Sequence, residues 1–137
     1  MISVLKRQNT LNYLAILSVL MIFMLSLLPA SDMYRTGAPK GVEHFVAYLG
    51  TGFLINLALR GGWREQMLTS TGLAVLAGAM EMLQQLSPGR TPHVSDFIAS
   101  AAGAVTGVMM AGVAFRYAAH RWGQGGAKMP RASGGGA

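Results

Sequence analysis

The segment FIASAAGAVTGVMMAGVAF, from Phe97 to Phe115, contains no charged side chain. A helix rises about 1.5 Å per residue, so this segment would be about 28 Å long as a helix. That length is close to the hydrocarbon core of a bilayer, which is about 30 Å thick. The segment is therefore predicted to be a membrane-spanning helix.

Small residues recur along this segment at every fourth position, which places them on one side of a helix. Helices in lipid associate mainly through close packing of such residues, because lipid chains are as apolar as leucine. The spacing indicates a helix contact without indicating whose helix is contacted. Packing within one bundle is favoured here over dimerisation of two chains. The predicted packing stripe consists of Ala99, Gly103, Gly107 and Ala111.

Three further apolar segments, residues 11–28, 42–59 and 67–86, are long enough to cross a bilayer. The composition agrees, since 52% of the residues are hydrophobic and only 12% are charged, against about 25% in soluble domains. We therefore expect an all-α integral membrane four-helix bundle, formed by residues 1–115. Residues 116–137 are basic and glycine-rich, and are expected to be a disordered cytoplasmic tail because they cannot bury enough apolar surface.

The first apolar segment has an alternative interpretation. Lys6 and Arg7 followed by an apolar run also describe a secretory signal peptide. This run is longer than the roughly 7–15 residues of a signal-peptide core, and LLPASD at residues 27–32 is a poor cleavage site. We therefore expect a retained helix.

The distribution of basic residues predicts an orientation, because cytoplasmic flanks of membrane helices are rich in lysine and arginine. With the N-terminus in the cytoplasm, most of the 11 basic residues fall on that side. These are Lys6, Arg7, Arg60, Arg64, Arg116, Arg121, Lys128 and Arg131. Both termini are therefore expected in the cytoplasm. An aromatic belt is expected at the inner boundary, made of Tyr13, Trp63, Tyr117 and Trp122.

Polar residues gather at the predicted outer boundary. Glu81 would lie about 7.5 Å inside the end of its apolar segment. A charged carboxylate costs about 2.5–3.5 kcal/mol at mid-bilayer and less near the boundary, so such residues face the bundle interior or a wet cavity. The candidate residues of this outer polar cluster are Glu43, His44, Tyr48, Glu81, Gln84, Gln85, Arg90 and Asp96.

Several roles are open to individual members of the cluster. Arg90 follows the turn-forming pair Pro88-Gly89 and is the expected counter-ion of Glu81 or Asp96, or a clamp for an anionic group. His44 could instead be a neutral imidazole that hydrogen-bonds a loop carbonyl. Asp96 or Ser95 could cap the last helix, and Ser95 is the expected cap.

The composition disfavours several classes of function. The net charge of +6 comes from basic residues at the ends of apolar segments, which is not the clustered soluble face that binds nucleic acid. Cysteine is absent, so disulfides, thiolate metal sites and cysteine nucleophiles are excluded. The sequence contains no HExxH, phosphate-binding loop or GxSxG pattern. No cofactor and no metal are expected, and the lipid bilayer is the expected partner.

At these positions the chain resembles the VanZ-like family of small bacterial membrane proteins. The matching motifs are EHFVAYLGTGF at residues 43–53, and Glu81-x-x-Gln84 followed by Pro88-Gly89-Arg90, Asp96, Gly103 and Gly107. The resemblance covers roughly residues 10–115. It implies a bacterial cytoplasmic membrane, and that His44, Glu81, Gln84, Arg90 and Asp96 occupy the family's characteristic polar positions.

The chain also departs from the family pattern at two places. The family often has an Asp-Lys pair shortly before the histidine, whereas here Lys40 stands four residues before His44 without an adjacent aspartate. This weakens a role for Lys40. The family often has asparagine where this chain has Ser100, which shortens the polar reach of the last helix.

Three functions are compatible with these features. The preferred one is an accessory or binding protein of the cell envelope, whose outer polar cluster holds a lipid-linked precursor or a lipoglycopeptide such as teicoplanin. The family resemblance supplies that context, since the family is named after an accessory protein of glycopeptide-antibiotic resistance. One alternative is a membrane-embedded acid/base or metal-dependent enzyme that acts on a lipid-linked substrate through His44, Glu81, His93 and Asp96. The other is a small structural subunit of a larger membrane complex.

Overall fold

The computed structural model describes residues 2–28, 37–60, 62–86 and 91–126, with side chains described from residue 6 to residue 121 within these ranges. The helices are α1 (Ile2–Leu27), α2 (Lys40–Leu59), α3 (Trp63–Leu83) and α4 (Val94–Gly126), with a short 3-10 helix η2 (Gln84–Leu86) after α3. No strand occurs in the described ranges. The predicted all-helical fold with four helices is confirmed.

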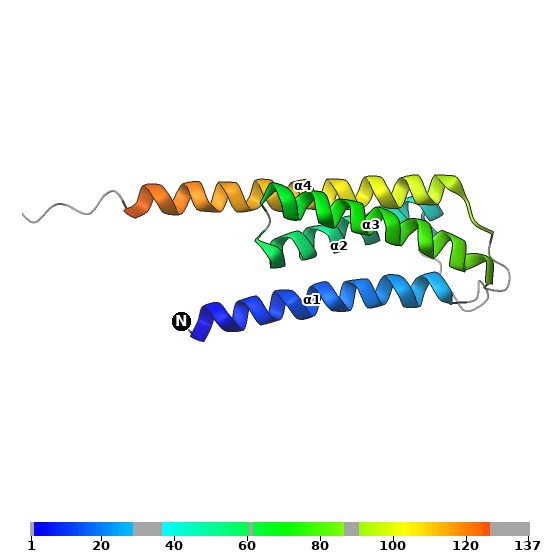
Figure 1. The fold of residues 1–137 in the computed structure, drawn as a ribbon, viewed down its shortest axis with the longest axis horizontal. Coiled ribbons are helices and arrows are strands. Elements are labelled where there is room, and N and C mark those ends of the chain that lie inside the picture. Colours follow the sequence, from blue (N-terminus) through cyan, green and yellow to red (C-terminus); the bar gives the residue numbers. More distant parts are fainter. Residues whose placement is uncertain (1, 29–36, 61, 87–90, 127–137) are drawn as a thin grey trace, which may run out of the picture.

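Successive helices run in opposite directions, which gives the bundle two distinct ends (Figure 1). We call the end where α2 and α4 begin and α3 finishes the polar end. The opposite end, where α1 and α3 begin and α4 finishes, is called the terminal end. The N-terminus and the C-terminal part of α4 therefore lie at the same end of the molecule (Figure 1).

Three of the helices are long and apolar enough to cross a membrane. The qualifying stretches are Lys6–Leu27 in α1, Lys40–Leu59 in α2 and Val94–Arg121 in α4. α3 is not among them, because it begins with a polar run, Arg64 to Gln66, and carries further polar side chains along its length. The structure thus supports a membrane protein with three helices of spanning composition, where the sequence predicted four.

The closest helix pair is α2 with α4, and we call their contact the α2–α4 seam. A Cβ added at Gly103 would meet the backbone carbonyl of Phe45, and one added at Gly107 would meet that of Leu49. Any side chain at these two positions would hold the helices apart. Because only glycine lacks a Cβ, the two backbones can come into direct contact, and close packing of this kind drives helix association in lipid.

The small-residue stripe continues on both sides of these glycines. A Cβ added at Gly41 of α2 would lie 3.7 Å from the Cβ of Ala99, and Ala111 is buried. The seam is reinforced by a hydrogen bond in which the Asn56 side-chain amide donates to the Val108 carbonyl at 3.0 Å. A polar bond between buried atoms of two membrane helices stabilises their association.

α1 packs more loosely than the other helices. Large apolar side chains such as Leu17 and Met24 are exposed along it, which suits contact with lipid chains. At the terminal end, the Gln8 amide nitrogen donates to the Ala58 carbonyl at 2.6 Å. The Gln8 amide oxygen accepts from Arg60 Nε at 3.2 Å. These bonds attach α1 to α2.

α4 continues beyond the other helices at the terminal end (Figure 1). Residues 116–126 are helical, whereas the sequence predicted a disordered tail from residue 116. Ala118, Ala119 and Arg121 are strong helix formers. Extending an existing helix also avoids the cost of a new nucleus. The rest of the predicted tail, residues 127–137, lies outside the described residues.

Candidate functional site

The candidate site is built at the polar end, where three helix termini converge. The first turns of α2 and α4 begin there, and α3 with η2 ends beside them (Figure 1). The α2–α4 seam fixes the height of one helix against the other, because Gly103 and Gly107 leave their backbones in contact. Polar side chains in the first turns of α2 and α4 are therefore held opposite one another.

An ion pair joins these two first turns. Lys40 Nζ lies 2.6 Å from Asp96 Oδ2, and the Asp96 side chain is only 5% exposed. His44 stands one turn after Lys40 on the same side of α2, and its Nε2 lies 3.9 Å from the same carboxylate oxygen. Asp96 also lies in the first turn of α4, where the helix dipole favours a negative charge. The carboxylate is thus stabilised by the cation of one helix and the dipole of another.

Glu81 connects α3 to the start of α4. Its Oε1 accepts a hydrogen bond from the backbone N–H of His93, the residue immediately before α4. The first N–H groups at a helix N-terminus have no partner inside the helix, so a carboxylate there satisfies one of them. Glu81 also acts electrostatically on the buried Tyr48 hydroxyl of α2. Glu81 therefore interacts with groups from two neighbouring segments.

Gln84 is fully buried at this end and has no hydrogen-bond partner among the described residues. Its exposed fraction is 0%, and neither its amide oxygen nor its amide nitrogen makes a hydrogen bond within the described ranges. It lies three residues after Glu81, which puts the two side chains on neighbouring positions of one helical face. A buried polar group without a partner costs about 1–3 kcal/mol. Gln84 can thus still donate and accept hydrogen bonds.

The other predicted members of the cluster are less buried than Asp96 and Gln84 where the structure describes them. Glu43 lies partly buried in the first turn of α2, and Gln85 is exposed. Ser95, the expected cap, is exposed inside the first turn of α4, and His93 precedes that helix. Arg90, the expected counter-ion, lies outside the described residues.

The sequence-based interpretation did not predict the inter-helix contacts that the structure shows for two residues. Lys40 is the ion-pair partner of Asp96, although its departure from the family pattern had weakened a role for it. The sequence feature that could have indicated its role is the i, i+4 spacing with His44, which puts both side chains on one face of α2. The hydrogen bond of Asn56 was not predicted either. Asn56 is the lone amide in the apolar run from residue 45 to residue 59, and this position could have indicated a buried inter-helix bond.

The chemistry of the cluster suits a polar head that carries both charged and hydrogen-bonding groups. The Lys40 side chain is 39% exposed and remains accessible to an anionic group. Gln84 is buried and Glu81 is partly buried, and both carry groups that can form hydrogen bonds. Within the described ranges, no three His, Asp or Glu side chains stand close enough to hold one metal ion.

Comparison of the chain with protein-family models, with curated proteins and with solved structures finds no match.

Proposed function

We propose that this protein is a VanZ-like membrane protein of the cell envelope that binds the polar head of an amphipathic molecule at its polar end. The class of ligand is a lipid-linked envelope precursor or a lipoglycopeptide, teicoplanin being one example. The observation that carries the proposal is Gln84, an amide that is fully buried and lacks a partner among the described residues. A bound polar head would give that amide the hydrogen bonds that the described residues do not supply.

The surrounding residues support the same assignment. Lys40 is accessible enough to pair with a phosphate or carboxylate of the ligand. Glu81 supplies an acceptor beside Gln84. The three helices of membrane-spanning composition put this cluster where a ligand's apolar chains can remain in lipid while its head is held by protein.

The proposal includes a topology in which all four helices cross a bacterial cytoplasmic membrane and both termini face the cytoplasm. α3 would cross although it is more polar, because α2 and α4 cover part of its surface. The N-terminus and the end of α4 lie at the same end of the molecule, which agrees with an even number of crossings (Figure 1). The chain lacks cysteine, so single-cysteine variants can be labelled selectively. A membrane-impermeant thiol reagent applied to intact cells should label position 93 and not position 120. The reverse pattern, or labelling of both, would contradict this topology.

The binding function is tested by photo-crosslinking in bacterial membranes. A photoreactive residue replaces Gln85, which is exposed beside Gln84, and a control replaces Val46, which is exposed on α2. Mass spectrometry of the adducts should show one polar-headed amphiphile enriched at position 85 over its share of the membrane. Position 46 should capture bulk phospholipid.

The variant Gln84→Leu separates binding from folding. Replacing an unpartnered buried amide by an apolar side chain of similar size should leave stability unchanged or raise it by about 1 kcal/mol. The enrichment at position 85 should nevertheless disappear. Capture in bulk proportions at both positions, or enrichment that survives Gln84→Leu, would contradict the proposal.

A structural role is the second candidate, and the Lys40–Asp96 ion pair favours it. The two charges satisfy each other and would pin α2 to α4 without any ligand. The chain would then serve as a small subunit of a membrane complex. A protein partner that co-purifies in equal amounts, together with bulk lipid capture at position 85, would support this candidate over binding.

A further inference from the structure

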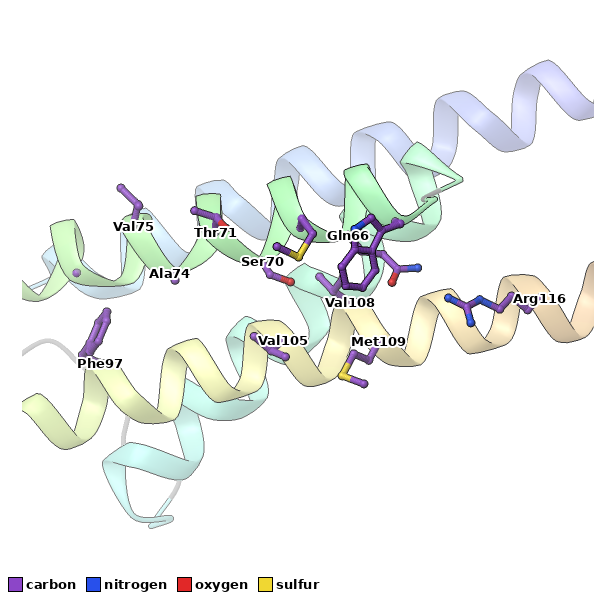
Figure 2. Close-up of a pocket in the computed structure, with 13 residues that line it drawn as sticks. Gln66, Ser70, Thr71, Ala74, Val75, Phe97, Val105, Val108, Met109 and Arg116 are labelled. Carbon is purple, nitrogen blue, oxygen red and sulfur yellow. The ribbon is translucent and has the colours of Figure 1, made fainter.

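An apolar groove runs between α3 and α4 and has a volume of about 880 Å³. Figure 2 shows its length along both helices, with Phe97 toward one end and Arg116 at the other. Between them the α4 side is formed by Val105, Val108 and Met109. Its lining is almost entirely apolar, and the charged groups of the polar end do not line it.

The two ends of the groove differ in chemistry. At the end of the groove nearest the polar end, a Cβ added at Gly78 would lie 3.6 Å from the Phe97 ring, so this ring and α3 nearly touch and close the groove. At the terminal end the groove is lined by Trp63, Gln66 and the guanidinium-bearing side chain of Arg116. The groove therefore leads from a cationic, aromatic mouth into an apolar interior.

The groove is long enough for an extended hydrocarbon chain. From Phe97 to Arg116 it follows α4 for about 28 Å. Flexible hydrocarbon chains are thin enough to enter it.

We propose that the groove binds an acyl chain of an anionic phospholipid, whose phosphate is held by Arg116. The guanidinium group is planar and pairs with phosphate oxygens through two parallel hydrogen bonds. Trp63, which is 71% exposed, lies at the same mouth, and tryptophan is enriched where a membrane meets water.

The part of the groove next to Arg116 matches the length of this occupant. Val105 and Arg116 are separated by about 16 Å along α4. One leaflet of a bilayer contributes about 15 Å of hydrocarbon, half of the core thickness. A chain whose phosphate rests on Arg116 would thus extend to about Val105. This site is independent of the proposed function, since it uses a different ligand class and the opposite end of the bundle.

Quenching of tryptophan fluorescence by brominated lipid tests the proposal in the full-length chain. Trp122→Phe leaves Trp63 as the single tryptophan at the groove mouth. The protein is placed in phosphatidylcholine nanodiscs that contain a minor fraction of phosphatidylglycerol. Brominated acyl chains are carried either by the phosphatidylglycerol or by an equal amount of the phosphatidylcholine. We expect the brominated anionic lipid to quench Trp63 with an apparent preference of about fivefold, since one basic residue at a membrane surface supplies an attraction of that size.

Matched variants identify the residues responsible. Arg116→Gln should abolish the preference. Arg121→Gln should retain it, because Arg121 stacks on the Tyr117 ring at 5.6 Å and does not line the groove. Ala74→Phe, which adds a ring inside the groove, should reduce quenching by both brominated lipids while the protein remains folded.

Three results would overturn the proposal. The first is equal quenching by the two brominated lipids, which would indicate ordinary bulk lipid. The second is an equal loss of preference in Arg116→Gln and Arg121→Gln, which would indicate a general attraction of the basic end. The third is a second copy in the groove, detected as concentration-dependent crosslinking through position 74 with no lipid preference. None of these results changes the capture expected at position 85, so the two proposals fail separately.

Discussion

α4 meets its two neighbours in opposite ways. Toward α2 it presents Gly103 and Gly107, and the helix backbones come into contact. Toward α3 it presents Val105 and Met109, which line a groove of about 880 Å³, while the two helices approach each other at Phe97 and Gly112. Both faces are apolar, so apolarity does not explain the difference. Side-chain size at the contact decides how closely the helices approach.

The difference assigns separate tasks to the two faces. The seam holds Lys40 close to Asp96, because Gly103 and Gly107 pack directly against the backbone of α2 and so fix the two first turns relative to each other. The α3 face leaves room that a flexible apolar molecule can occupy. A close contact therefore positions the polar end, and a loose contact provides the groove.

The largest expected effect comes from a side chain placed in the seam. Gly107→Leu puts a Cβ against the Leu49 carbonyl, where the neighbouring atoms are backbone and cannot rotate away. We expect a loss of at least about 3 kcal/mol, the upper end for overpacking, measured as the free energy of unfolding in mixed detergent micelles.

Gly50→Leu is the matched control on α2, since a Cβ there meets nothing within 4 Å. Its effect should stay within about 0.5 kcal/mol. Equal stability of the two variants would show that the helices are not in backbone contact at Gly107.

A smaller effect is expected from the polar bond that reinforces the seam. Asn56→Ala removes the donor to the Val108 carbonyl and should cost about 1 kcal/mol, within the range for hydrogen bonds between membrane helices. The exposed Asn12 of α1 is the control, and Asn12→Ala should have almost no effect on the same unfolding measurement. An equal loss of unfolding free energy at positions 12 and 56 would show that the hydrogen bond from Asn56 to Val108 does not stabilise the seam.

The smallest effect is expected on the α3 face of α4. Ala74→Phe directs its new ring into the groove, so the free energy of unfolding should change by less than about 0.5 kcal/mol. Differential scanning fluorimetry in detergent would follow it. A loss as large as that of Gly107→Leu would mean that the two faces are equally tight and that the comparison is wrong.

The helical fold followed from the sequence more completely than the pairing of its helices. Apolar segments of bilayer length predicted the helices, and the four-residue spacing of small residues predicted a close contact along α4. The identity of the partner helix did not follow, because GxxxG spacing describes only one of the two surfaces that meet. The groove did not follow either, since it depends on how far α3 stands from α4.

The polar end was predicted in composition and only partly in pairing. Polar groups near a membrane boundary need either an interaction partner or a function. This reasoning selected Glu81, Gln84 and Asp96. The pairing of Lys40 with Asp96 was not predicted, because it depends on how α2 is rotated and shifted along α4. The seam determines that arrangement, and it cannot be read from a single sequence. The end of α4 was predicted too early, at residue 115, whereas the helix continues to Gly126. The glycines and charges of the last residues outweighed the helix formers before them in that prediction.

The most direct measurement is a double-mutant cycle between Lys40 and Asp96, which tests whether the seam holds α2 and α4 together at the polar end. The free energy of unfolding is measured for the parent protein, Lys40→Gln, Asp96→Asn and the double variant. We expect a coupling of about 1 kcal/mol, since Asp96 is buried while Lys40 is partly screened by solvent. Effects that add to within about 0.3 kcal/mol would show that the two charges do not meet, and would contradict the arrangement of the polar end.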